Sequence, residues 1–196
     1  MILRSWQQKI IDDYPSIIKQ NKRFILKAPT GAGKTILASE IVERFYKEKK
    51  ILVLCHRLVL LEQLERALSK RHKVRKLSLS ESGPAFNDYD ILLSTNMRAK
   101  EVLEEAIRLA DLIIVDEAHR VSPNGSGYKK ILDDFESYGK PDAQFMGLTA
   151  SPERRTGDQR DQLNLAFDAI IDCADIETLI EEGILVPPIY RPHFVH

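Results

Sequence analysis

The chain has 196 residues, a length that suits one α/β domain with a substantial hydrophobic core. Hydrophobic residues make up 43% of it and charged residues 30%, and the 29 basic and 29 acidic side chains cancel, so overall charge does not indicate a nucleic-acid-coating protein. No apolar run reaches the roughly 20 residues that cross a bilayer, and Cys55 and Cys173 form no disulfide or metal pattern, which favours a cytoplasmic or nucleoid-associated protein without a membrane partner.

Strand-length apolar runs alternate with stretches of helical period along the chain. The first stretch predicts an amphipathic helix, since its large apolar residues recur at spacings of three and four: Trp6, Ile10, Ile11, Tyr14, Ile17 and Ile18. The pattern then predicts strands over 23–27, 50–54, 74–79, 91–94, 112–115 and 145–148. Further helices are expected from Gly33 onward and over 58–68, 99–109, 128–138 and 176–182, with loops over 80–90 and 122–127.

The strands themselves indicate how the sheet is built. The run over 112–115, Leu-Ile-Ile-Val, is apolar throughout, which is typical of parallel strands that helices cover on both faces. Strand and helix in repetition predict an α/β fold with an open, doubly wound, mainly parallel sheet flanked by helices. Ligands of such sheets bind beyond the carboxyl ends of the strands. We expect one domain over 1–186, followed by an exit segment over 187–196 that begins with two prolines.

The clearest motif follows the first predicted strand and reads Ala-Pro-Thr-Gly-Ala-Gly-Lys-Thr over 28–35. Its glycines allow a tight turn whose N–H groups point at phosphate oxygens, and the helix that follows adds positive charge at its amino end. Lys34 would reach the β and γ phosphates, and the Thr35 hydroxyl would bind magnesium. The predicted nucleotide-binding residues of the loop are Pro29, Thr30, Gly31, Ala32, Gly33, Lys34 and Thr35. Ala28 replaces the usual first glycine; the flanking strand and helix argue against a chance glycine turn.

A second motif, Asp116-Glu117-Ala118-His119, comes directly after the apolar strand over 112–115. An acidic residue at a strand end can hold magnesium, and its neighbour can orient or deprotonate an attacking water. We assign Asp116 to the metal with Thr35, and Glu117 to the water, so that Lys34, Asp116 and Glu117 form the candidate catalytic set. The alternative is a capped helix start, where acidic residues are also favoured.

A third motif, Gly-Leu-Thr-Ala-Ser-Pro over 147–152, ends the strand predicted over 145–148. Thr149 and Ser151 carry hydroxyl groups where that strand would meet the site. They could hydrogen-bond His119 or Glu117 and thereby couple the nucleotide to the rest of the domain. The alternative is an ordinary strand end stopped by Pro152.

Together these motifs resemble those of superfamily 2 helicases. The segments that carry the resemblance, in the order and spacing of that family, are 3–7, 28–35, 55–57, 94–95, 116–119 and 149–151. Within the superfamily the chain is similar to the branch of XPB, RadD, UvsW and the type I and type III restriction subunits, in which chains open Leu-Arg-x-Tyr-Gln. Splicing helicases carry Ser-Ala-Thr where this chain has Thr-Ala-Ser at 149–151. The resemblance implies a RecA-like P-loop NTPase domain.

The resemblance also implies roles for individual residues. Gln7 would contact the adenine edge with Arg4 nearby, making ATP the nucleotide, since an amide can both donate and accept. Arg57 and Thr95 would contact nucleic-acid phosphates without regard to sequence. His119, Thr149 and Ser151 would couple the nucleotide to movement. Two alternatives stay open: Gln7 as a solvated helix residue and Arg57 as an ordinary surface charge. The implied function is an ATP-dependent helicase or translocase, on DNA rather than RNA.

Motors of this superfamily contain two RecA-like domains with ATP between them. The second supplies arginine fingers, and nothing after residue 152 resembles its motifs. We therefore expect a second RecA-like domain as a partner, in cis or in trans, and an isolated chain that is nearly inactive as an ATP hydrolase. Two other functions stay open: the motor portion of a restriction or defence nuclease complex, and a nucleotide-dependent nucleic-acid-binding module without turnover. The intact Lys34, Asp116 and Glu117 argue against the module.

Overall fold

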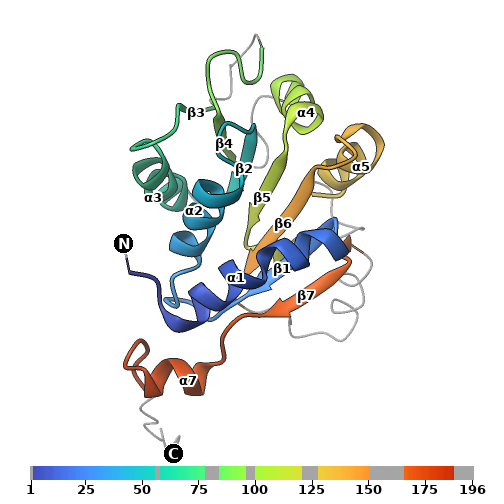
Figure 1. The fold of residues 1–196 in the computed structure, drawn as a ribbon. Helices are drawn as coiled ribbons and strands as arrows, with labels where there is room; N and C mark the ends of the chain where they lie inside the picture. Colours follow the sequence, from blue (N-terminus) through green and yellow to red (C-terminus); the bar gives the residue numbers. More distant parts are fainter. Residues whose placement is uncertain are drawn as a thin grey trace, which may run out of the picture.

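A seven-stranded parallel sheet forms the centre of the structure, which is a computed structural model that describes residues 2–55, 58–77, 84–95, 100–120, 128–150 and 166–187. The strands lie in the order β3-β4-β2-β5-β6-β1-β7 (Figure 1). Their bounds are β1 (Arg23–Lys27), β2 (Ile51–Cys55), β3 (Val74–Lys76), β4 (Ile91–Thr95), β5 (Leu112–Asp116), β6 (Gln144–Thr149) and β7 (Ala169–Asp172). Every pairing between neighbouring strands is parallel, which confirms the predicted fold class.

Helices cover both faces of this sheet. They are α1 (Ser5–Gln20), α2 (Lys34–Phe45), α3 (Leu58–Leu68), α4 (Lys100–Leu109) and α5 (Tyr128–Tyr138), whereas the short helix α7 (Ile176–Glu181) follows the edge strand β7. One hydrophobic core lies under α1, α2 and α3, and the other lies under α4 and α5 (Figure 1). In β2, Ile51, Val53 and Cys55 face the first core, whereas Leu52 and Leu54 face the second. Burial on both faces is therefore why the predicted strands read as continuous apolar runs.

The predicted elements agree with the structure except at a few boundaries and one strand. Of the strand predicted over 74–79, β3 comprises Val74–Lys76, Leu77 is not part of it, and residues 78 and 79 lie outside the described residues. The strand predicted over 145–148 extends to Gln144–Thr149. The sequence pattern does not predict β7, a short strand beside β1 with half-exposed residues. The predicted loop over 122–127 and residues 188–196 of the exit segment lie outside the described residues. Within the described part of the chain, no helix has the length and apolar character needed to cross a membrane.

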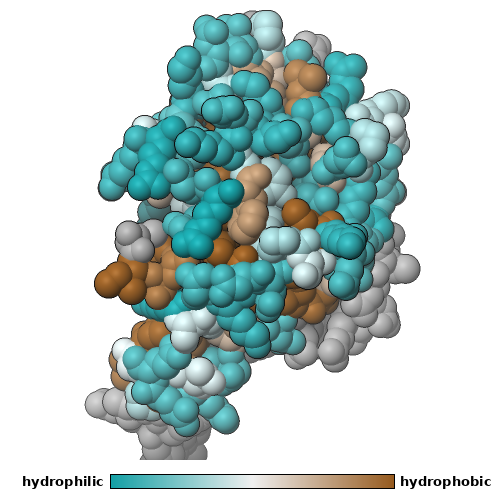
Figure 2. All heavy atoms as spheres, viewed as in Figure 1, coloured by the Kyte–Doolittle hydropathy of each residue, from teal (hydrophilic) through white to brown (hydrophobic). Residues whose placement is uncertain are grey.

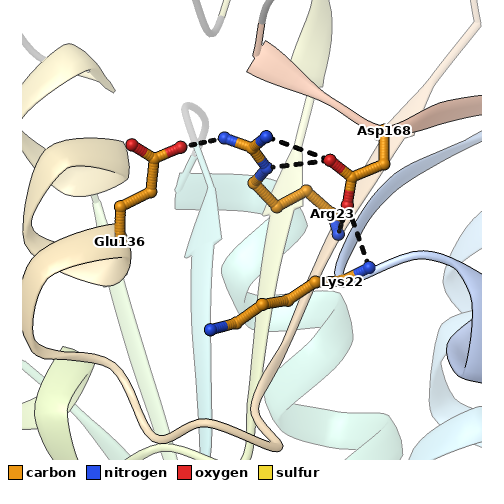
Figure 3. Close-up of polar contacts among 4 residues, drawn as sticks. All are labelled: Lys22, Arg23, Glu136 and Asp168. Carbon is orange, nitrogen blue, oxygen red and sulfur yellow. Dashed lines mark hydrogen bonds and ion pairs between the residues drawn. The ribbon is translucent and has the colours of Figure 1, made fainter.

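A cluster of charged groups joins the amino ends of β1 and β7 to α5 (Figure 3). Arg23 donates two hydrogen bonds to Asp168 Oδ1, from Nε at 3.2 Å and from Nη2 at 3.0 Å. The other carboxylate oxygen, Asp168 Oδ2, accepts from the backbone N–H groups of Lys22 at 2.9 Å and Arg23 at 2.8 Å. The guanidinium of Arg23 also pairs with Glu136 of α5. Asp168 therefore aligns the start of β7 with the start of β1.

Replacing Asp168 by asparagine is expected to lower the free energy of unfolding by about 1–2 kcal/mol near neutral pH, because a neutral amide makes weaker hydrogen bonds to Arg23. Burial would raise the pKa of Asp168, but the backbone and side chain of Arg23 outweigh it and hold that pKa below its ordinary value. A lowered pKa stabilises the fold above the ordinary pKa of about 3.9, and this stabilisation is lost as the pH falls through the lower folded value.

The measurement is urea unfolding at a series of pH values, with Asp142→Asn, a change at an exposed aspartate, as the matched control. The difference in the free energy of unfolding between wild type and Asp168→Asn should narrow below about pH 4, because the carboxyl is protonated first in the unfolded state and, at lower pH, in the folded state as well. If the difference in the free energy of unfolding stayed unchanged down to pH 2, the charge of Asp168 would contribute nothing to stability.

Candidate nucleotide site

Three predicted motifs lie at the carboxyl ends of three neighbouring strands. In the sheet order, β5, β6 and β1 are adjacent, and each of these strands ends in one of the motifs (Figure 1). The register aligns Asp116 with Leu148, and Lys27 with Thr149. The predicted phosphate loop (28–35), the acidic pair (Asp116 and Glu117) and Thr149 therefore share one edge of the sheet, although they are far apart in the sequence. This convergence is what the parallel fold requires of the three motifs.

The loop over 28–33 has the backbone geometry that its glycines allow. Gly31 and Gly33 have φ angles of 81° and 105°, which side-chain-bearing residues rarely adopt. A methyl group at Gly33 would also lie 2.8 Å from Gln7 Nε2. The loop is tied to the sheet where the Ala28 N–H donates to the carbonyl of Thr149 at 3.0 Å. Ala28, the departure from the usual glycine, is 1% exposed, so its methyl group packs in the core.

Lys34 is held by the loop that precedes it. Its ammonium group donates to the carbonyl oxygens of Ala28 at 2.9 Å and Pro29 at 3.1 Å. Burial lowers the pKa of Lys34, and the carboxylates of Glu117 and Asp116 partly offset that shift. The lysine therefore lies in a partly desolvated position and interacts electrostatically with both acidic residues.

Arg4 and Gln7, at the start of α1, contact the same loop. Gln7 accepts a hydrogen bond from the backbone N–H of Arg4 at 3.0 Å and donates one to the carbonyl of Gly33 at 3.0 Å. Arg4 Nη1 donates to the carbonyl of Ala32 at 2.5 Å. Gln7 is only 1% exposed, so the alternative of a solvated helix residue is wrong. These bonds hold the amino end of α1 against the phosphate loop.

The acidic motif turns sharply as it leaves β5. Glu117 has a φ angle of 53°, in the left-handed region that non-glycine residues seldom occupy, and the 3₁₀ turn η1 (Ala118–Arg120) follows. His119 Nδ1 lies 3.0 Å from Thr149 Oγ1 and 3.2 Å from Glu117 Oε2. A carboxylate can only accept, so a hydrogen bond between His119 and Glu117 requires a proton on Nδ1. The histidine therefore links the acidic motif to the end of β6, a contact that the sequence predicted as one of its options.

Three other predicted site residues are not seen among the described contacts around the phosphate loop and the acidic motif. Thr95 ends β4, which β2 separates from β5, so it lies at the same edge of the sheet but further along it. Its backbone carbonyl accepts a hydrogen bond from Ser94 Oγ at 2.9 Å. Arg57 and Ser151 lie outside the described residues.

The segment around α7 is a neighbour of the site that no sequence motif predicts. A methyl group at Gly31 would lie 3.5 Å from Leu185 Cδ2, and Ser5 Oγ donates to Glu182 Oε1 at 2.6 Å. The one local sequence signal for the end of α7 is Gly183, because glycine is common just after a helix. Its φ angle of 68° in the structure fits that position. The packing of this segment beside the loop depends on contacts between the two ends of the chain, which no local pattern reveals.

Comparison with known proteins agrees with the resemblance of the motifs to superfamily 2 helicases and restriction subunits. Residues 1–154 match the family model described as type III restriction enzyme, res subunit. The endonuclease subunit of the type I restriction enzyme EcoAI from Escherichia coli is 30% identical over 74% of this chain. The ATP-dependent RNA helicase DHX58 of Mus musculus is 30% identical over 91% of it. The chain spans only 19% of the first protein and 29% of the second.

Solved structures share the fold at lower identity. The Hef helicase domain of Pyrococcus furiosus aligns with a TM-score of 0.65 and 24% identity, over 86% of this chain and 37% of that one. The type ISP restriction-modification enzyme LlaGI, solved with a DNA substrate mimic, aligns with a TM-score of 0.68 and 21% identity, over 94% of this chain and 21% of that one. The chain therefore belongs to the family of type III restriction enzyme res subunits and has the fold of the first RecA-like motor domain of superfamily 2 helicases.

Proposed function

We propose that this ATPase motor domain binds ATP with Mg²⁺ and uses its hydrolysis to move along, or to unwind, a nucleic acid, with DNA preferred to RNA. One observation carries the proposal: the phosphate loop, an acidic pair and a histidine–threonine contact converge at the ends of three adjacent strands. Family membership supports the ATP hydrolase chemistry. The track, the metal and the role of each residue are what the proposal adds.

The side chains at this edge fit a magnesium nucleotide. The Lys34 ammonium is held at the loop, and α2 begins directly after Gly33, so helix dipole and charge both favour an anion there. The hydroxyl of Thr35 and the carboxylate of Asp116 are the hard oxygen donors that magnesium prefers, and we assign them as its ligands. When bound, the metal would supply positive charge that offsets the negative charge developing on the phosphate.

Arg4 and Gln7 are the proposed recognition residues for adenine. Both contact the phosphate loop through hydrogen bonds, so they flank the position of the phosphates. Hydrophobic surface gathers between the amino end of α1 and α7 on a face that is otherwise mainly hydrophilic (Figure 2). Among the described residues, Ile2 and Val186 are the most exposed large hydrophobic side chains at these two ends. An apolar surface beside an amide that can donate and accept suits a purine ring.

Glu117 is the proposed general base. In hydrolysis a water oxygen bonds to the γ-phosphorus, the bond from that phosphorus to the β–γ bridging oxygen breaks, and Glu117 takes the proton of the water. The products are ADP and inorganic phosphate. His119 would orient the Glu117 carboxylate through its Nδ1 proton, at 3.2 Å. Its contact with Thr149, together with Ser151 further along the chain, would couple the γ-phosphate to the end of β6.

Nucleic acid would lie across the carboxyl ends of β2 and β4. Thr95 ends β4, and Arg57 comes two residues after Cys55, which is the register partner of Thr95. We propose that both residues contact phosphates. Solved relatives with DNA support this choice: LlaGI with a DNA substrate mimic and the SWI2/SNF2 ATPase core of Sulfolobus solfataricus with double-stranded DNA, which aligns with a TM-score of 0.57 and 24% identity. DHX58 is an RNA helicase, so RNA is tested beside DNA.

Binding should be measured for single-stranded and double-stranded DNA and RNA, with and without ATP, at several salt concentrations. Contacts to phosphates predict that log K falls linearly with log salt, and Arg57→Ala is expected to reduce the slope by about one unit. Arg108→Ala removes the same charge from the end of α4, where the chain enters the amino end of β5, and serves as the matched control. Equal, salt-independent binding of all four nucleic acids, or an Arg108→Ala effect as large as that of Arg57→Ala, would contradict the proposed track.

A second candidate function is the motor of a restriction complex. The observation in its favour is the family model, together with the 30% identity to the EcoAI endonuclease subunit. A restriction motor would translocate on double-stranded DNA without separating its strands. A triplex-displacement assay and a strand-separation assay on the whole protein distinguish the two, because a translocase displaces the third strand and leaves the duplex intact.

A further inference from the structure

Gly147 lies where three parts of the domain meet. A methyl group added there would lie 2.6 Å from Ala118 Cβ, 3.0 Å from Ile25 Cγ1 and 3.3 Å from Phe167 Cε1. Ile25 is its register partner on β1, and Phe167 comes just before β7. Glycine normally weakens the interior of a strand, unless another part of the chain has to approach the backbone closely. In the second core, that close neighbour is Ala118, which is fully buried.

Ala118 is the middle of the acidic motif's turn. It follows Glu117, whose φ angle of 53° is unfavourable for a side-chain-bearing residue, and precedes His119. A residue in that region of φ and ψ persists when surrounding contacts fix it. The packing of Ala118 against the bare backbone of Gly147 is such a contact, because 2.6 Å leaves no room for Ala118 to stay in place beside any side chain.

The same face of β6 holds the partner of His119. Side chains two residues apart on a strand point to the same side, so Thr149 lies on the face where Gly147 contacts Ala118. Thr149 Oγ1 is 3.0 Å from His119 Nδ1. β6 therefore contacts the turn at two successive positions on one face: a glycine that admits the turn, and a hydroxyl that contacts its histidine.

We infer that Gly147 is a positioning residue for ATP hydrolysis. Its missing side chain seats Ala118 on β6, which fixes the left-handed backbone at Glu117 and sets the His119–Thr149 contact. Gly147 touches no substrate in this scheme and acts only through Ala118 and the turn. The inference rests on the proposed function, since it assumes that Glu117 handles the attacking water.

The test is Gly147→Ala in the 196-residue chain, with enzyme in excess over radiolabelled ATP and Mg²⁺ so that even slow hydrolysis is followed. A displacement of about 1 Å at a reacting group costs up to roughly 100-fold in rate, so we expect hydrolysis to slow by roughly 10- to 100-fold. The affinity for ATP should change less than about threefold, because the hydrogen bonds that hold Lys34 in the phosphate loop involve neither Gly147 nor Ala118. Adding Ala118→Gly removes the methyl group that Gly147→Ala would strike, and should restore most of the rate.

Gly139→Ala is the matched control. A methyl group there would lie 2.5 Å from the Phe135 carbonyl oxygen, at the end of α5, so it disturbs the fold away from the acidic motif. Thermal unfolding is measured for all variants. Equal losses of rate in Gly139→Ala and Gly147→Ala at equal loss of stability would overturn the inference, as would a normal rate in a folded Gly147→Ala variant or the absence of rescue by Ala118→Gly.

Two further variants keep the outcome interpretable. If Gly147→Ala does not fold, Ala118→Ser crowds the same contact from the motif's side and must lower the rate more than the ATP affinity. Glu117→Gln reports on the proposed function in the same assay. Wild-type hydrolysis in Glu117→Gln would mean that the proposed function is wrong, whereas an inactive Glu117→Gln beside a fully active Gly147→Ala would mean that only the positioning role is wrong.

Discussion

Replacing Glu117 by glutamine is expected to slow ATP hydrolysis by about 10²–10⁴-fold while ATP binding is retained. The amide cannot take a proton from water, yet it keeps the size of the side chain and can still contact His119, 3.2 Å away. The hydrogen bonds that hold Lys34 in the loop do not involve Glu117, so the variant should accumulate bound ATP. The measurement is single-turnover hydrolysis beside equilibrium binding of ATP, best made with this domain joined to a second RecA-like domain.

Glu62→Gln on α3 is the matched control, because it makes the same chemical change at an exposed helix position. It should hydrolyse ATP at the wild-type rate. An unchanged rate in Glu117→Gln would show that another group accepts the proton, and a loss of binding in that variant would show that Glu117 holds the nucleotide rather than the water.

The isolated chain is expected to hydrolyse ATP about 10³–10⁵-fold more slowly than the same domain joined to a second RecA-like domain. The reason is electrostatic: the charge that develops on the transferring phosphoryl group needs cations on all sides, and an arginine finger from a facing domain supplies one. In the described residues at this edge of the sheet, Lys34 and Arg4 are the cations that contact the phosphate loop. Steady-state ATPase rates of the 196-residue chain, alone and joined to a second RecA-like domain, provide the measurement.

A comparable rate in the two proteins would contradict this prediction. The rate of the isolated chain should also be measured over a range of protein concentrations, because a second copy could supply an arginine in trans. A rate per molecule that rises with concentration indicates such pairing, and one that stays low and constant supports the requirement for a second RecA-like domain. Lys34→Ala, which removes the loop's ammonium, is the blank in both series.

The parts of the fold that follow from local pattern were predicted from the sequence. β2 and residues 112–115 of β5 are apolar throughout because both faces of these strands are buried, and this is a property of each segment alone. β7 was missed because Ala169–Asp172 are only partly buried and the strand is defined by its pairing with β1, not by its own pattern.

The candidate site divides in the same way. The sequence predicts the residues of the loop and of the acidic pair, because phosphate and metal chemistry restrict the residue types that can serve there. Parallel topology accounts for their meeting at one edge of the sheet. The sequence does not predict the close approach of Ala118 to Gly147, because a glycine in a strand can also mark a bulge or a bend. Nor does it predict the contact of Leu185 with the loop at Gly31. Both depend on distances between segments that are far apart in the sequence.

The position of β1 between β6 and β7 has a consequence for how the molecule is made. The strand that leads into the phosphate loop comes early in the chain, but both of its neighbours come late, so its pairing joins distant segments. Such long-range pairing is slow, because a long loop must close before any bond forms. A ribosome would have to release residues through Asp172 before the loop has its final support. A growing chain should therefore bind ATP only late in its synthesis. The fraction of chains that retain ATP would then report the fraction that have finished folding.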